Sequence, residues 1–159
     1  MQYTNILVPY DDSEQSQRAL QAAIDLSTGV GHHVKITVLH VTYFTDVDDP
    51  SFDVAARMAG APVLDADTKK EVRKNLFESY ENDIKEKIEK FFESLPDNID
   101  LKIDVKDGKP QSLIVEYADD NDIDCIVMGS RGLGAITAAL GSVSTYVLRT
   151  SDLPVLVIR

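Results

Sequence analysis

Five short apolar runs alternate with four stretches of helical periodicity, and this alternation limits the possible fold more than any other feature of the sequence. The runs, most of them near-continuous in Val, Ile and Leu, cover residues 5–9, 34–41, 101–106, 123–128 and 154–159. This order predicts parallel strands joined by right-handed helical crossovers. We therefore expect residues 1–159 to form one domain with an α/β fold. Its core would be a single doubly wound five-stranded parallel sheet of strand order 3-2-1-4-5, with helices on both faces.

Polar residues mark where the expected helices begin. Asp12, followed three residues later by Gln15, resembles a capping box for the first helix. Asp67 is expected to cap a long helix that ends near residue 95, and Ser142 or Ser144 to cap the last helix. The long helix has an apolar face opposite a charged one, formed by Val72, Leu76, Tyr80, Ile84, Ile88 and Phe91. The run at 101–106 alternates polar and apolar residues, which predicts an edge strand.

Residues 42–64 show no clear periodicity and include Asp46, Asp48 and Asp49. A connection this long inside a compact domain is usually functional or poorly ordered. Two interpretations remain open: a lid over a ligand, or a surface excursion with a short helical piece near residues 54–58. The aspartates lack metal-ligand spacing, so we expect no metal site there.

Glycines cluster directly after the fourth apolar run, at residues 129–134. They remove side chains that would block a ligand and permit unusual backbone angles. A second signal, Gly141-Ser142, precedes the last helical pattern, whose first amide N–H groups have no partner within the helix. A glycine-rich turn beside a helix N-terminus can bind an anion through its backbone. The stretch is either such a phosphate site or an ordinary strand-to-helix turn in which the glycines serve close packing.

The first strand also ends in polar sequence, Pro9-Tyr10-Asp11. In doubly wound sheets ligands bind beyond the carboxyl ends of the strands, where the strand order reverses. In the order 3-2-1-4-5 that point lies between the first and fourth strands. We therefore expect both polar ends to line one crevice.

The composition excludes several classes of partner. The net charge is −11, which disfavours binding to nucleic acid or to an anionic membrane. No apolar run approaches the length that spans a bilayer, and the first residues do not resemble a signal peptide. One cysteine permits no internal disulfide. These features together predict a cytoplasmic protein.

Other reactive residues have simpler interpretations. Cys125 lies within an apolar run and is expected to be a buried, inert thiol. His40 ends the second strand near the expected crevice, where a structural role is favoured over a catalytic one. There is no P-loop lysine and no histidine pair with metal spacing. Arg131 either pairs with a phosphate or faces water.

Taken together, these motifs resemble the universal stress protein family along essentially the whole chain. Ile6-Leu-Val-Pro-Tyr-Asp-Asp-Ser is similar to the family's first strand and aspartate turn, and Met128-Gly-Ser-Arg-Gly to its first phosphate element. Gly141-Ser-Val-Ser and Pro154-Val-Leu-Val-Ile are similar to its closing half. The family's ATP-binding branch has the pattern Gly, two residues, Gly, nine residues, Gly, then Ser or Thr. This chain departs from it, with eight residues (133–140) between the second and third glycines.

The resemblance implies a nucleotide site in which the first strand and Val41 contact the adenine and ribose, and the glycine elements hold the phosphates. The expected binding residues are Pro9, Tyr10, Asp11, Val41, Met128, Gly129, Arg131, Gly132, Gly141, Ser142, Val143 and Ser144.

The expected function is that of a regulatory stress-response protein that binds ATP, with Mg²⁺ or Mn²⁺ as a possible companion of the phosphates. A nucleotide-free dimeric scaffold and a slow ATPase are the alternatives, and we expect hydrolysis to be slow or absent. The apolar last strand and the resemblance both predict a homodimer through residues 154–158.

Overall fold

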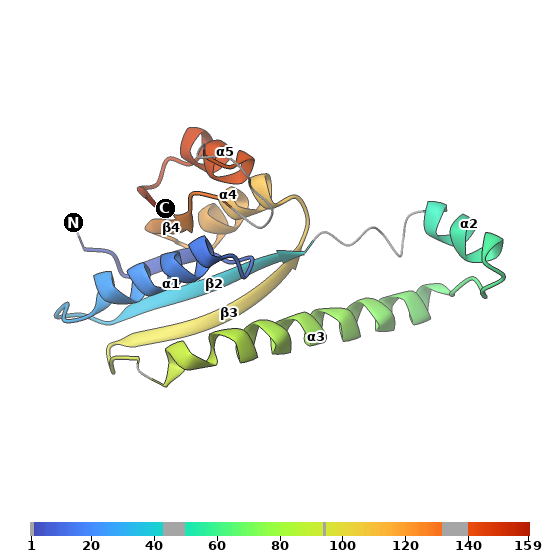
Figure 1. Cartoon of the computed structure of the whole chain (residues 1–159), viewed down its shortest axis with the longest axis horizontal. Helices are drawn as coiled ribbons and strands as arrows, with labels where there is room; N and C mark the ends of the chain where they lie inside the picture. The colour runs from blue at the N-terminus through green and yellow to red at the C-terminus, as the bar shows by residue number, and fades with distance from the viewer. Residues whose placement is uncertain (1, 43–49, 94, 132–139) are drawn as a thin grey trace.

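The computed structural model describes residues 2–42, 50–93, 95–131 and 140–159. Its strands form one parallel sheet of order β3-β2-β1-β4-β5 (Figure 1). The strands are β1 (Asn5–Pro9), β2 (Val34–Thr42), β3 (Ile99–Asp107), β4 (Cys125–Gly129) and β5 (Val155–Ile158). The helices are α1 (Glu14–Ser27), α2 (Pro50–Met58), α3 (Ala66–Phe92), α4 (Pro110–Asp120) and α5 (Ser142–Thr150). The predicted fold class and strand order are confirmed, and β3 is an edge strand as expected.

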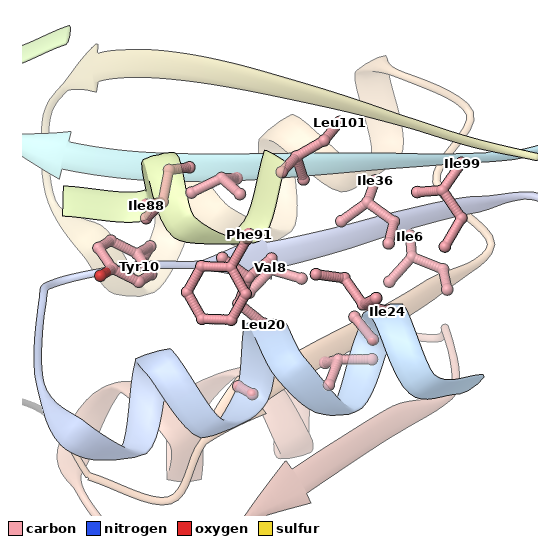
Figure 2. Close-up of a cluster of buried hydrophobic side chains, with 14 of the residues drawn as sticks. Ile6, Val8, Tyr10, Leu20, Ile24, Ile36, Ile88, Phe91, Ile99 and Leu101 are labelled. Carbon is pink, nitrogen blue, oxygen red and sulfur yellow. The ribbon is translucent and has the colours of Figure 1, made fainter. Parts of the chain in front are cut away.

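Successive side chains of the central strands pack against different helices. From β1, Ile6 and Val8 join a buried cluster with α1 and the end of α3, whereas Leu7 joins a second cluster with α4 and α5. Figure 2 shows the first cluster, in which Leu20 of α1 and Phe91 of α3 approach the same side of the sheet. Helices therefore cover both faces, which explains the near-continuous apolar character of the inner strands.

Three of the expected helix caps differ by a few residues. Ser13, not Asp12, caps α1, since the Ser13 side chain accepts a hydrogen bond from the Ser16 amide. Asp65, not Asp67, caps α3 in the same way through Thr68. The cap of α5 is Gly141, and within the described residues no side chain caps this helix. Several consecutive residues at each start could act as a cap, and the path of the preceding chain selects one of them.

Only the C-terminal half of α3 packs against the sheet. Its buried residues are Ile84, Ile88 and Phe91, while Tyr80 is 38% exposed. Figure 1 shows the first half of α3 extending beyond the sheet together with α2. The predicted apolar face is therefore buried only where the helix overlaps the strands. Even this longest helix is too polar to cross a bilayer, and no other helix in the described ranges has the necessary length and apolar content.

The long connection after β2 contains α2, a longer helix than the expected piece at 54–58, with no buried residue. The stretch with the three aspartates, 43–49, lies outside the described residues.

Candidate functional site

A cavity of about 420 Å³ lies at the carboxyl ends of β1, β2 and β4. The predicted residues that line it are Pro9, Tyr10, Asp11, Val41, Met128, Gly129, Arg131, Gly141, Ser142, Val143 and Ser144. Gly132, the remaining predicted residue, lies outside the described residues. The topology thus brings together segments far apart in the sequence at the point where the strand order reverses.

The pleat of the strands decides which side chains face the cavity. On β2, Leu39 and Val41 belong to the side of the sheet covered by α4 and α5, and so does Met128 of β4. All three line the cavity, as does Ile114 of α4. The deeper wall is therefore apolar and suited to a flat, uncharged ring system.

Asp11 is held in place by the start of α1. Its Oδ1 accepts hydrogen bonds from the Ser13 amide at 3.1 Å and from the Ser13 hydroxyl at 2.6 Å. Ser13 in turn caps α1 through the Ser16 amide at 3.1 Å. The carboxylate is thus part of the turn that begins α1, and its position depends on that turn.

Tyr10 contributes its main chain to the cavity wall, because its side chain lies in the cluster on the other face of the sheet (Figure 2). Its hydroxyl donates to Asp12 Oδ1 at 3.1 Å, and burial followed by the Asp12 charge raises the pKa of Tyr10. Nδ1 of His40 lies 2.7 Å from the carbonyl oxygen of Tyr10, and the His40 ring stacks on Tyr80. These contacts fit the structural role expected of His40.

The turn after β4 and the start of α5 are hydrogen-bonded to each other. The Gly141 amide donates to the carbonyl oxygen of Ser130 at 2.8 Å, and the Ser144 hydroxyl donates to the same oxygen at 2.8 Å. The Ser130 amide donates to Ile158 of β5 at 2.7 Å. The two glycine elements are therefore adjacent in space, although eight residues separate Gly132 from Gly141 in the sequence. The Ser144 hydroxyl therefore holds the turn after β4 against the start of α5.

Both signs of charge are present at the cavity. Among the described lining residues, Asp11 carries the negative charge and Arg131 the positive one. The start of α5 adds amide N–H groups and the positive end of the helix dipole. The charged and polar groups of the site thus come from the turn after β1, the turn after β4 and the start of α5, and the apolar lining comes from β2, β4 and α4.

Four lining residues were not predicted: Ser16, Leu39, Pro110 and Ile114. Leu39 was accessible to sequence reasoning, because it lies two positions before Val41 on the same face of β2. Pro110 and Ile114 lie one helical turn apart at the start of α4. That start follows β3 and so lies at the same edge of the sheet. Only the packing of α4 against β2 reveals that it reaches the cavity.

The lid interpretation of residues 42–64 finds no support in the described part of this connection. No residue of α2 lines the cavity, and Figure 1 shows α2 at the far end of α3. The other interpretation, a surface excursion with a short helix, describes what is seen from Pro50 onward.

Cys125 is buried on β4, as predicted. Burial, and then the nearby Asp124 charge, raises the pKa of the Cys125 thiol to about 11. The neutral thiol is thus the form present near pH 7, which fits an inert side chain.

The sheet and its crevice define the class of doubly wound α/β domains, in which ligands bind at the topological switch point. Residues 2–159 match the model of the Universal stress protein family, and the chain belongs to that family.

Individual relatives agree with this assignment. Universal stress protein MJ0577 of Methanocaldococcus jannaschii is 31% identical over 167 residues, covering 99% of this chain and 95% of that protein. A solved structure of MJ0577 superimposes with a TM-score of 0.70 at 26% identity, covering 99% of this chain and 96% of that one. A universal stress protein family protein from Arabidopsis thaliana, solved with AMP bound, shares the fold with a TM-score of 0.54 at 19% identity. The match covers 98% of this chain and 90% of that one.

Proposed function

We propose that this chain is a nucleotide-binding regulatory protein of the ATP-binding branch of its family and that ATP occupies the cavity beside β1 and β4. The observation that carries the proposal is that the glycine turn after β4 meets the N-terminus of α5 beside an apolar pocket. The volume of about 420 Å³ lies within the range typical of small-molecule sites. The AMP bound by the Arabidopsis thaliana relative agrees with an adenine nucleotide.

The apolar wall would hold the adenine. Val41 of β2, Met128 of β4 and Ile114 of α4 offer aliphatic and thioether surface to the cavity. Asp11 lines the same cavity at the end of β1, and its carboxylate would accept hydrogen bonds from the ribose hydroxyls.

The phosphates would lie at the start of α5. The amides of Ser142, Val143 and Ser144 belong to the first turn of the helix, and such amides are a common phosphate site. Hydrogen bonds to a charged group contribute about 1.5–3 kcal/mol each. A few of them, with burial of the base, could reach roughly −8 kcal/mol, which corresponds to a micromolar dissociation constant.

A divalent ion would depend mainly on the phosphates. Asp11 is the one carboxylate among the described lining residues, and Mg²⁺ commonly uses one or two carboxylates together with substrate phosphates. This set provides charge compensation but no fixed arrangement for activating water. We therefore propose that bound ATP acts as a regulatory ligand and is hydrolysed slowly at most.

The proposal includes a homodimer formed through β5. This strand is at the edge of the sheet, and Leu156 is 39% exposed. An exposed apolar edge is a template for strand pairing, and antiparallel pairing of two copies across a twofold axis would complete its hydrogen bonds.

Calorimetry with ATP and Mg²⁺, and analysis of nucleotide released from heat-denatured protein, test the proposal directly. Gly141→Val is the informative variant. The φ of Gly141 is −68°, which any residue adopts, and an added Cβ would lie 3.4 Å from its nearest neighbours. The variant should fold, with side-chain atoms added at the cavity wall and ATP binding abolished.

Gly31→Val is the matched control, because a Cβ at Gly31 would meet nothing within 4 Å and this turn is not part of the cavity wall. It should bind ATP like the wild type. Absence of ATP binding by the wild type at millimolar nucleotide would reject the proposal and favour the nucleotide-free scaffold.

A further inference from the structure

The turn between β1 and α1 is held by α3. Asp12 follows Asp11 in this turn, and its Oδ2 lies 3.0 Å from Nζ of Lys87 on α3. The Tyr10 hydroxyl donates to the other oxygen of Asp12 at 3.1 Å. Lys90, three residues after Lys87 on α3, makes a second contact: its Nζ donates a hydrogen bond to Oε1 of Gln17 in α1 at 3.4 Å. The buried half of α3 thus reaches the turn that carries Asp11 through Lys87, and the start of α1 through Lys90.

Asp12 has a backbone conformation that needs such support. Its φ is 64°, in the left-handed region that residues with a Cβ disfavour, and among the described non-glycine residues only Asp122 shares it. A conformation of this kind persists where surrounding contacts determine it. Burial alone raises the pKa of Asp12, but the hydrogen bonds from Lys87 and Tyr10 outweigh it and hold the pKa below its ordinary value. The contacts therefore favour the charged carboxylate.

The conformation of Asp12 also determines where Asp11 lies. Asp11 Oδ1 binds the amide and hydroxyl of Ser13, so its side chain spans Asp12. A change of the Asp12 backbone would move the two ends of this bridge relative to each other. The position of the Asp11 carboxylate on the cavity wall is therefore coupled to Asp12.

We propose that Lys87 and Asp12 are positioning residues for the nucleotide: their ion pair holds the left-handed turn that places Asp11 at the ribose end of the cavity. The inference rests on the proposed function. It gives α3, which contributes no residue to the described cavity wall, a role in ligand affinity.

Calorimetry with ATP and Mg²⁺ on the full chain tests this role. Lys87→Met keeps most of the aliphatic stem and removes the charge. Because the pair is partly exposed, with side chains 39% and 32% accessible, we expect the dissociation constant to rise about two- to fivefold. Lys87→Arg should restore most of the affinity. The ratio of the dissociation constants of Lys87→Met and the wild type should approach one as salt is added, because screening weakens the ion pair in the wild type.

Asp83→Asn is the matched control. Asp83 lies one turn earlier on α3, and its Oδ2 is 2.9 Å from the same lysine nitrogen. Among the described residues it makes no hydrogen bond or ion pair with the turn between β1 and α1. Its substitution should leave the affinity unchanged. Asp12→Asn, which tolerates the left-handed conformation, should weaken binding like Lys87→Met, and the double variant should be no weaker than either single one.

The outcomes separate the two proposals. If the wild type binds ATP and Lys87→Met binds it equally tightly, the positioning role is overturned and the proposed nucleotide site remains. A loss of affinity in Asp83→Asn equal to that in Lys87→Met also overturns it. Wild-type protein that does not bind ATP removes the proposed function and the positioning role together.

Discussion

Gly129 ends β4 against the first turn of α1, and Gly129→Ala should destabilise the fold through this contact. An added Cβ would lie 2.8 Å from Gln15 Cβ and 3.0 Å from the Gln15 carbonyl carbon. Gln15 is in the first turn of α1, so the nearest atoms include helix backbone and cannot move aside by a rotamer change. The φ of Gly129 is not positive, so the penalty comes from packing alone.

Overpacking of this kind costs about 1–3 kcal/mol. For a chain of this length, 1 kcal/mol lowers the melting temperature by about 2–4 °C, so a cost of this size lowers it by about 2–12 °C. A displacement of α1 would also move Ser13 and the Asp11 carboxylate bound to it. We therefore expect ATP affinity to fall together with stability.

Thermal unfolding followed by circular dichroism measures the effect, with Gly141→Ala as the control. A Cβ at Gly141 would meet its nearest atoms at 3.4 Å, an ordinary contact, and the backbone there suits alanine. That variant should melt within about 2 °C of the wild type, because the poorer fit of alanine at the N-cap of α5 is offset by the restriction that alanine places on the unfolded chain. Equal melting temperatures for Gly129→Ala and wild type, or an equal decrease in the control, would refute the packing argument.

Three further predictions concern the edge of the sheet, the chemistry of the bound nucleotide and the buried thiol. Leu156→Lys should convert the expected dimer to a monomer, as measured by light scattering at micromolar concentration. Leu26→Lys, at an exposed position of α1, is the control and should leave the dimer intact. A dimer that persists in Leu156→Lys would exclude β5 as the contact. Phosphate release with Mg²⁺ or Mn²⁺ should stay well below about 1 s⁻¹, and a rate above that value, lost in Asp11→Ala, would establish an enzyme. Cys125 should resist alkylation at pH 8 in the folded state, and labelling as fast as in denatured protein would contradict its burial. Because its pKa rises from 9.0 to about 11 on folding, its contribution to stability is present below pH 9 and is lost as the pH rises through 11.

Much of the fold and the site followed from local patterns. Buried runs such as the one ending at Met128 identify inner strands, and their alternation with helices leaves few topologies. The same reasoning located Asp11 and Gly141 at one edge of the sheet, since the carboxyl ends of parallel strands lie together. Each of these inferences depends on residues close in sequence or on a rule of connection, so the sequence was sufficient.

The tertiary structure decided what depends on distance between elements. The charged face and apolar spacing of α3 gave no sign that its first half would extend beyond the sheet, because burial depends on the length of the strands it meets. Ile114 reaches the cavity only because α4 packs against β2. The ion pair of Lys87 and Asp12 joins residues that no local pattern relates. The physical reason is that helix and strand formation is governed by neighbouring backbone and side-chain periodicity. Contacts across the chain arise only once the sheet and its helices are packed together.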